Sequence, residues 1–459
     1  MKYDAIVIGS GQAGTPLSKK LAEAGLKTAL IEKRWVGGTC VNDGCSPTKA
    51  MIASAKLAWS VANSDVLGVH VGSYTVDLRE ILERKNEIVH RMRGNSEKGI
   101  LETDNLDLIY GTASFTAEKE ITVKLNTGEV QVLTADKFFL NVGEHPMIPD
   151  IEGINEVEYL TSTSIMELQE IPEHLVIIGS GYIALEFGQM YRRFGSKVTI
   201  LEQSERILHR EDEDIAAEVV KIFTEEEIEI ITDCKVELIK KEGDSLNIFV
   251  SVDETAKNIS CSHILVGAGR KPNTADLGLA VAGVQVDEKG YIQVNDKLET
   301  TAEGIYALGD AKGGPAFTHI AYDDYRIIRK NVIEKGDASI KDRLVPYCMF
   351  IDPQLGRVGI TEQEAKESGK NIIVATIPNT SVARSIETGD TRGMMKAVID
   401  ADTGKILGAS VLAPEGGEVV TILQMAMMGG ITYDQIKEGV FAHPTYAESL
   451  NNLFMTLDK

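Results

Sequence analysis

The chain has 459 residues, of which 43% are hydrophobic and 25% charged, and its length predicts about three domains. This composition is typical of a globular protein and excludes a disordered, collagen-like or coiled-coil chain. The formal charge of −22 argues against nucleic acid or an anionic membrane as a partner, because both would repel so acidic a protein. No apolar run approaches the ~20 residues that cross a bilayer, and a strand begins too early to leave room for a signal peptide. We therefore expect a cytoplasmic protein.

The first predicted unit is a strand, a glycine-rich turn, a helix and a second strand. An apolar run over 4–8 leads into Gly9, Gly11 and Gly14, and the strand over 28–31 ends at Glu32. Glycines at these positions allow a tight turn, the approach of backbone amides to a pyrophosphate, and close packing of helix on strand. An acid about 20 residues downstream accepts hydrogen bonds from a ribose. The pattern predicts a βαβ dinucleotide-binding unit.

Cys40 and Cys45 follow this unit, five residues apart. The five cysteines of the chain are too few for a secreted disulfide framework. A structural zinc site needs about four ligands, and the sequence has no second cysteine pair or Cys/His cluster. We predict a redox-active pair at Cys40 and Cys45, no metal site, and structural roles for the isolated Cys234, Cys261 and Cys348.

The glycine-rich pattern returns 170 residues after its first occurrence. An apolar run over 175–178 leads into Gly179, Gly181 and Ala184, and the strand over 198–201 ends at Glu202. A helix over 77–101 and strands over 113–125 and 130–142 are predicted between the two copies. One glycine-rich turn is weak evidence, but two copies with strand, helix and terminal acid in register predict two dinucleotide sites.

The character of the chain changes near Lys341. Before it, residues 267–273 are typical of a turn and a boundary, and a short strand over 304–308 leads to Asp310. After it, strands are predicted over 345–350, 372–377, 394–399 and 406–412, followed by helices over 417–428 and 433–438. This order predicts a separate α+β domain.

Together these motifs resemble those of the class I pyridine nucleotide–disulfide oxidoreductases, flavoproteins that include dihydrolipoamide dehydrogenase, glutathione reductase and mercuric reductase. The resemblance rests on both glycine-rich units, the cysteine segment 37–49 and the C-terminal segment 441–448. It implies an α/β fold with two Rossmann-like dinucleotide-binding domains and a C-terminal α+β dimerisation domain. The expected boundaries are 1–150 with 273–340 for an FAD-binding domain, 151–272 for an NAD(P)-binding domain, and 341–459 for the interface domain.

The resemblance also implies catalytic roles. Cys45 would lie against the flavin as a thiolate, and Cys40 would exchange with the substrate. An acid–base group with a pKa near neutral suits thiol–disulfide exchange, and His443, oriented by Glu448, would supply it from the partner subunit of a homodimer. Lys49 and Glu186 would form an ion pair near the flavin and complete this set.

The same resemblance assigns the cofactors, FAD and NAD(P)H, and the residues that would hold them. These are Gly9, Gly11, Gly14, Glu32, Thr39, Ala113, Gly143, Gly179, Gly181, Tyr182, Ile183, Ala184, Glu202, Gly269, Asp310, Phe317 and Thr318. Two departures from the family pattern stand out. Residues 141–143 read Asn-Val-Gly in place of Ala-Thr-Gly, and Asp43 and Ser46 make the cysteine segment more polar than usual. We expect the second departure to change the redox potential of the pair.

The choice between NADH and NADPH depends on a few side chains. Glu202 would bind a free ribose hydroxyl and repel a 2′-phosphate, which favours NADH. Ala184 and Tyr182 are more typical of NADPH-using reductases, and Arg206 and Arg210 are near enough in sequence to reach a phosphate. Because the charge argument outweighs a packing preference, we favour NADH.

The expected substrate is a small disulfide or dithiol, with lipoamide first. An alternative is a reductase of metal ions or of oxidant-stress products that uses the same dithiol, because 345–359 resembles mercuric reductases and 448–454 resembles bacterial flavoproteins linked to oxidant and copper stress. Residues 451–459 lack the vicinal cysteine pair of mercuric reductases, which argues against efficient mercury reduction. A minor alternative is a flavoprotein that senses redox state without turnover.

Overall fold

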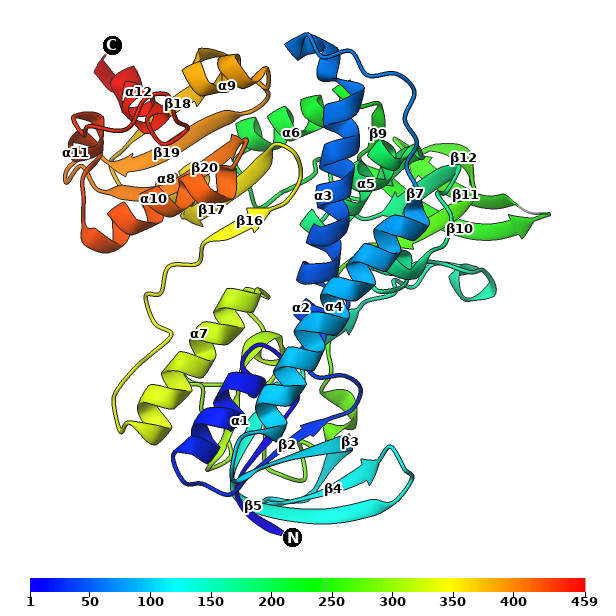
Figure 1. Cartoon of the computed structure of the whole chain (residues 1–459), viewed down its shortest axis with the longest axis vertical. Coiled ribbons are helices and arrows are strands. Elements are labelled where there is room, and N and C mark those ends of the chain that lie inside the picture. Colours follow the sequence, from blue (N-terminus) through cyan, green and yellow to red (C-terminus); the bar gives the residue numbers. More distant parts are fainter. Residues whose placement is uncertain (244, 459) are drawn as a thin grey trace. The chain divides into compact units, whose positions relative to one another are not determined.

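The computed structural model describes residues 1–243 and 245–458, which divide into two compact units (Figure 1). Unit 1 comprises Met1–Ala50, Leu82–Met147 and Gly269–Arg343, and unit 2 comprises Met51–Ile81, Ile148–Ala268 and Leu344–Lys459. Two long helices, α3 (Cys45–Ala62) and α4 (Leu78–Leu101), each have residues in both units. Among the described residues, no helix has both the length and the apolar character that a membrane span requires.

Unit 1 is built on a mostly parallel sheet. The parallel strands lie in the order β3-β2-β1-β5-β15, and β4 pairs antiparallel with both β3 and β5. These strands are β1 (Lys2–Ile8), β2 (Thr28–Glu32), β3 (Leu106–Ala117), β4 (Glu120–Leu125), β5 (Val130–Leu140) and β15 (Ile305–Ala307). The helices that accompany them are α1 (Gly14–Glu23), α2 (Gly38–Asn42), α7 (Thr318–Ile328) and most of α4. A small antiparallel pair, β6 (Glu144–Pro146) and β14 (Arg270–Pro272), completes the unit.

Both faces of this sheet are buried, as its nearly continuous apolar strands predict. Ile6 belongs to one apolar cluster and its neighbour Val7 to another, because successive side chains of a strand point to opposite faces. Leu17 and Leu21 lie four residues apart on α1 and join the cluster of Val7. The helix therefore lies on the sheet directly after the first glycine-rich turn.

Two sheets of unit 2 surround the second glycine-rich turn, and a third lies in its C-terminal part. Its parallel sheet has the order β13-β7-β8-β9, and a three-stranded antiparallel sheet has the order β10-β11-β12. The strands are β7 (His174–Ile178), β8 (Lys197–Leu201), β9 (Ile228–Ile231), β10 (Cys234–Glu242), β11 (Ser245–Val252), β12 (Thr255–Cys261) and β13 (His263–Val266). Helices α5 (Tyr182–Phe194) and α6 (Glu213–Glu225) pack on the parallel strands.

The C-terminal part of unit 2 is an antiparallel sheet covered by helices. The strand order is β16-β17-β20-β19-β18, and α10 packs on β17 and β20. The strands are β16 (Tyr347–Met349), β17 (Gln354–Gly359), β18 (Ile372–Pro378), β19 (Met394–Asp400) and β20 (Ile406–Ala413). The helices are α8 (Glu362–Glu367), α9 (Ala383–Thr388), α10 (Gly416–Gly429), α11 (Tyr433–Lys437) and α12 (Ser449–Met455).

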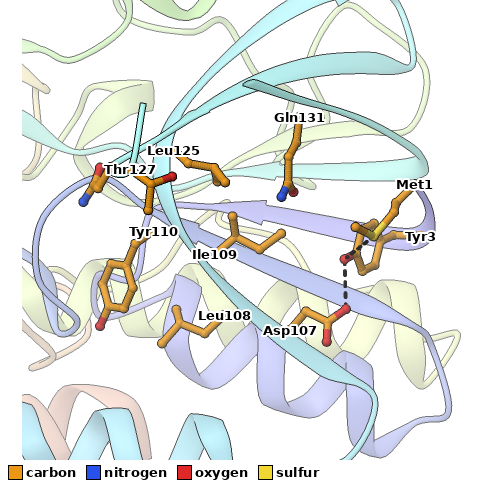
Figure 2. A pocket seen from close by; sticks show the side chains of 10 residues that line it. Met1, Tyr3, Asp107, Leu108, Ile109, Tyr110, Leu125, Thr127 and Gln131 are labelled. Atoms are coloured by element: carbon orange, nitrogen blue, oxygen red, sulfur yellow. Dashed lines mark hydrogen bonds between the residues drawn. The ribbon is translucent and has the colours of Figure 1, made fainter. Parts of the chain in front are cut away.

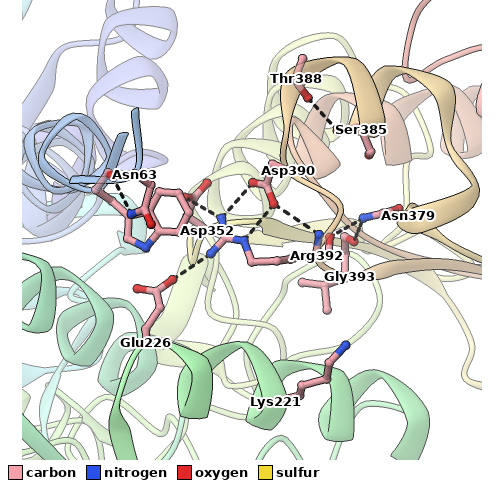
Figure 3. Close-up of polar contacts among 12 residues, drawn as sticks. Asn63, Lys221, Glu226, Asp352, Asn379, Ser385, Thr388, Asp390, Arg392 and Gly393 are labelled. Carbon is pink, nitrogen blue, oxygen red and sulfur yellow. Dashed lines mark hydrogen bonds and ion pairs between the residues drawn. The ribbon is translucent and has the colours of Figure 1, made fainter. Parts of the chain in front are cut away.

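Asp352, between β16 and β17, is the centre of a buried charge network in unit 2 (Figure 3). Its Oδ2 accepts hydrogen bonds from Arg193 Nη1 at 2.9 Å and from Arg392 Nη2 at 3.3 Å. Arg392 also binds Glu226 at 2.8 Å. The two guanidinium groups lie 5.1 and 4.4 Å from the ring of Trp59 on α3. Helices α3 and α5, the segment before β19 and the segment after β16 are thus held together by these charged side chains.

Candidate functional site

The first glycine-rich turn follows β1 and packs against the segment after β5. Gly9 has a φ of +98°, and a Cβ on it would lie 2.2 Å from the carbonyl oxygen of Asn141. A Cβ on Gly14 would lie 1.9 Å from the carbonyl oxygen of Gly9. Only glycine fits either position, so α1 begins directly against the turn and its N-terminal amides face the edge of the sheet.

Glu32 is held by the turn it faces. Its Oε2 accepts hydrogen bonds from Ser10 N at 3.0 Å and Ser10 Oγ at 2.7 Å, and its Oε1 accepts one from Arg34 N at 2.8 Å. Three donors fix both oxygens at the carboxyl end of β2, and each oxygen has a further lone pair that can accept a ribose hydroxyl.

The second copy repeats this arrangement in detail. Glu202 Oε2 accepts hydrogen bonds from Ser180 N at 3.1 Å and Ser180 Oγ at 2.5 Å, and Oε1 accepts one from Ser204 N at 2.8 Å. Burial raises the pKa of Glu202, but the bonds from Ser180 and Ser204 outweigh it and hold this pKa below the usual value. A Cβ on Gly181 would meet no atom within 4 Å, so the backbone here is open to a ligand. The sequence signal for these serines was a Gly-Ser-Gly triplet in both copies, and it was missed.

Asn141, one of the two departures from the family pattern, joins the first turn to a distant strand. Its Oδ1 accepts a hydrogen bond from Gly14 N at 2.9 Å, and its Nδ2 donates one to Leu308 O at 3.2 Å. The amide thus ties the start of α1 to the end of β15, and the side chain is buried. This amide bridge is the structural consequence of having Asn at position 141.

Asp310 lies just after β15, beside a second buried acid. Burial and the charge of Glu144 raise the pKa of Asp310 to about 6. Glu144 itself accepts hydrogen bonds from Tyr291 Oη at 2.8 Å and Arg270 Nε at 3.2 Å.

Gly9, Glu32 and Asp310 all follow or end parallel strands, so they lie at one edge of the sheet, where α/β folds bind ligands.

The predicted cysteine pair lies at the junction of α2 and α3. Cys40 is half-buried and Cys45 is exposed, and both side chains are thiols in this structure. A hydrogen bond to Cys45, together with burial, raises the pKa of Cys40, so Cys40 keeps its proton and donates to Cys45. Cys45 Sγ also lies 3.4 Å from Oγ1 of Thr318, the first residue of α7, where the helix dipole stabilises a thiolate.

Comparison with known proteins identifies the family. The family model for pyridine nucleotide–disulphide oxidoreductases matches residues 3–324, and the model for their dimerisation domain matches residues 345–454. The chain belongs to the pyridine nucleotide–disulfide oxidoreductases. Members of this family depend on FAD and use NAD(P)H, which confirms the predicted cofactors. The predicted fold is confirmed as well, and the dimerisation domain indicates a homodimer.

Relatives in this family include three kinds of enzyme. The chain is 38% identical to the probable pyridine nucleotide-disulfide oxidoreductase RclA of Escherichia coli, over 99% of both proteins. It is 36% identical to a mercuric reductase of Staphylococcus aureus, over 100% of this chain and 83% of the relative. It is 31% identical to a dihydrolipoyl dehydrogenase of Geobacillus stearothermophilus, over 98% of this chain and 94% of the relative. A solved structure of the Cu(II) complex of RclA superposes with a TM-score of 0.92 at 37% identity, covering 100% of both chains. These relatives support the metal and oxidant-stress alternative better than the lipoamide expectation.

The residues of unit 1 fit the FAD on which the family depends. The space beside Gly9 and Gly14 excludes any side chain, the Glu32 carboxylate is preset at the end of β2, and Asp310 offers a buried carboxyl group to a hydroxylated ligand. The family's redox cysteines would then be Cys40 and Cys45 of the same unit.

The acid–base pair expected in this family lies in unit 2. His443 Nδ1 is 3.0 and 2.9 Å from the two carboxylate oxygens of Glu448, which sets Nδ1 as the donor and leaves Nε2 as the basic nitrogen. Glu186 Oε1 accepts a hydrogen bond from Phe350 N at 2.8 Å. Lys49 belongs to the other unit, so its pairing with Glu186 stays a prediction.

Unit 1 also has a surface hollow of about 500 Å³ that contains none of the predicted site residues (Figure 2). It is lined by Met1, Tyr3, Asp107, Leu108, Ile109, Tyr110, Leu125, Asn126, Thr127 and Gln131. Within it, Tyr3 Oη donates a hydrogen bond to Asp107 Oδ2 at 2.8 Å, so these polar groups already satisfy each other.

Among residues 1–243 and 245–458, no group of three or more His, Cys, Asp or Glu is arranged to hold a metal ion.

Proposed function

We propose that this flavoprotein uses NADH to reduce Cys40 and Cys45, and that the reduced pair then reduces Cu(II) in preference to lipoamide. The hydrogen-bonded pair beside the start of α7 carries the proposal, because it places the protonated Cys40 next to a Cys45 sulfur at a helix N-terminus, where a thiolate would be stabilised. The similarity to RclA, whose solved structure is a Cu(II) complex, supports copper as the acceptor.

The electron balance of this cycle is simple. When bound, FAD supplies the two-electron exchange between NADH and the cysteine pair. A hydride equivalent breaks the bond between the two sulfurs and leaves a Cys40 thiol and a Cys45 thiolate. Two Cu(II) ions then accept one electron each, the sulfur–sulfur bond forms again, and one proton is released. For a disulfide acceptor, His443 of the partner subunit would hold the proton that leaves Cys40.

NADH is the favoured donor for two structural reasons. Glu202 is a carboxylate at the end of β8, where it would repel a 2′-phosphate. Arg206 is already occupied, since its guanidinium donates to the carbonyl oxygens of Leu208, His209 and Glu211 at 3.0–3.4 Å. These backbone hydrogen bonds hold the guanidinium near 208–211, which weighs against a role for Arg206 in holding a phosphate.

We also propose the three-domain assignment, with 1–150 and 273–340 for FAD, 151–272 for NADH and 341–459 for the subunit interface. The division between the two compact units at 147/148 and 268/269 supports the first two boundaries. The match of the dimerisation model to 345–454 supports the third.

The acceptor is tested by measuring NADH oxidation without oxygen, with lipoamide and with Cu(II) in one buffer, and by trapping Cu(I) with a chelator. We expect Cu(II) reduction to exceed lipoamide reduction and to depend on Cys40, with Cys40→Ser falling to the enzyme-free rate. Lipoamide turnover near the median enzyme rate of ~10 s⁻¹, with Cu(II) reduction unchanged in Cys40→Ser, would instead make this a dihydrolipoamide dehydrogenase.

A further inference from the structure

Asp43 is an acid inside the redox segment, three residues after Cys40 and two before Cys45. Its side chain is only 11% exposed, and its Oδ2 forms an ion pair with Arg34. Its Oδ1 is buried and accepts no hydrogen bond from any residue that the structure describes. Arg34 is therefore the group that compensates this buried carboxylate.

A second arginine holds the neighbouring residue. Arg93 Nε donates a hydrogen bond to Asn42 Oδ1 at 2.7 Å. The guanidinium groups of Arg34 and Arg93 lie 4.7 and 4.2 Å from the ring of Trp35, so both cations flank one indole. Burial, and then the charge of Arg34, lower the pKa of Arg93, whereas Asp43 raises it. Positive charge is thus concentrated beside the redox segment, and Asp43 is the acid within that segment that opposes it.

We propose that Asp43 is a positioning residue that sets the reduction potential of the Cys40–Cys45 pair by neutralising Arg34. This inference rests on the proposed function, because it requires that the two cysteines form a redox pair.

The geometry brings the carboxylate close enough to act. Asp43 N donates to Thr39 O at 3.0 Å, so the helical turn of α2 continues to residue 43. Cα atoms three residues apart at the end of a helix are about 5 Å apart, which is inside the ~8 Å screening length of physiological salt. The charges of Asp43 and Arg34 are therefore near enough to affect the sulfur of Cys40.

The sign of the effect follows from the charge that reduction creates. Reduction of the disulfide yields a thiolate, which nearby positive charge stabilises and nearby negative charge destabilises. Asp43→Asn leaves the charge of Arg34 unopposed, so the pair becomes easier to reduce. Arg34→Gln leaves the carboxylate unopposed, so the pair becomes harder to reduce. Removing both charges together restores the balance.

The test is a redox equilibrium of the FAD-loaded protein in glutathione buffers without oxygen, followed by alkylation of free thiols and trypsin digestion. Cleavage after Arg34 and Lys49 releases a peptide, 35–49, that contains Cys40 and Cys45 and no other cysteine. The alkylated fraction of this peptide measures how much of the Cys40–Cys45 pair is reduced, and it does not depend on turnover. In Arg34→Gln the corresponding peptide begins at residue 34, because trypsin then cleaves after Lys33.

We expect the equilibrium constant for reduction by glutathione to rise about threefold to tenfold in Asp43→Asn and to fall by a similar factor in Arg34→Gln. The double variant should lie within about twofold of the wild type. Lys2→Gln, which breaks an exposed ion pair with Asp136 in the same unit, is the matched control and should cause no shift.

Two failures of this test are distinguishable. If the wild-type peptide contains no disulfide between its cysteines under any buffer ratio, the proposed redox pair is wrong. If the disulfide forms but both single variants shift in the same direction, or neither shifts, the role of Asp43 is wrong. A merely structural role would loosen the segment in both variants and could not produce opposite shifts.

Discussion

Single side chains of unit 1 set the charge and proton state at the site. Cys40 keeps its proton because it is half-buried and hydrogen-bonded to Cys45, and partial burial beside Glu144 raises the pKa of Asp310 to about 6. Asn141 carries no charge and instead joins Gly14 to Leu308, which follows β15 and lies 167 residues after Asn141. The states of Asp310 and Asn141 depend on neighbours that are distant in sequence, whereas Cys40 depends on Cys45, five residues away.

The raised pKa of Asp310 makes the stability of the FAD-free protein depend on pH. Its pKa of about 6 in the folded state exceeds the ~3.9 of an unfolded aspartate, so the folded protein binds more protons between these values. Stability therefore falls by about 3 kcal/mol in total as the pH rises through both pKa values, from about pH 3 to about pH 7, and stays reduced above that. Asp310→Asn should remove this loss, as measured by urea unfolding of both proteins at pH 4.5 and 7. If the unfolding free energies of the two proteins depended equally on pH, the raised pKa of Asp310 would be wrong.

At the scale of elements, the glycine-rich units show what sequence predicts well. The spacing of Gly9, Gly11 and Gly14 and the acid at Glu32 predicted strand, turn, helix and strand, and the observed β1, α1 and β2 agree closely. The role of Ser10 was missed, because its hydrogen bond to Glu32 becomes visible only when the turn is placed against the end of the strand. Local periodicity predicts elements, whereas side-chain pairs across the sheet need the tertiary structure.

The end of β8 should decide between the two nicotinamide cofactors. Wild-type kcat/KM should be higher with NADH than with NADPH, and Glu202→Gln should shift that ratio about tenfold toward NADPH, because one charge repulsion with the 2′-phosphate is removed. Glu205→Gln, an exposed neighbour, is the control and should leave the ratio unchanged. A higher efficiency of the wild type with NADPH would show that Glu202 does not select the cofactor.

The network around Asp352 should hold elements of unit 2 together. Burial raises the pKa of Asp352, but Arg193, Arg392 and Lys56 outweigh it and keep this pKa below its usual value. Asp352→Ala leaves two arginines buried with less compensation and should destabilise the protein by about 3–5 kcal/mol in thermal or urea unfolding. Arg384→Ala breaks an exposed pair with Glu387 and should cost about 1 kcal/mol or less. A similar cost for both variants would mean that the buried network adds nothing.

At the scale of the whole molecule, the dimerisation domain indicates a homodimer. Motif order predicted the fold class and the homodimer, because repeats and family motifs specify domains rather than contacts. It did not predict that Asn141 bridges Gly14 and Leu308, or that Asp43 pairs with Arg34. These contacts depend on side-chain directions that composition and periodicity do not encode.

A mixed dimer tests whether the active site is shared between subunits. Cys45→Ser and His443→Gln homodimers should each lose at least ~100-fold of disulfide turnover, because one lacks the thiolate and the other the acid–base group. A heterodimer purified with two different tags should regain about half of wild-type activity, since one of its two sites then has both Cys45 and His443 intact. Activity no higher than that of the two homodimers would place His443 in the site of its own subunit.

The central claim is that Cys40 and Cys45 store two electrons in addition to those held by the flavin. It is tested most directly by titrating the oxygen-free, FAD-loaded protein with dithionite and counting the electrons taken up per subunit. A redox pair beside one FAD predicts four electrons in the wild type and two in Cys45→Ser, with equal FAD content in both. Uptake of two electrons by both proteins would show that the cysteines do not form a redox pair, and would contradict the proposed function.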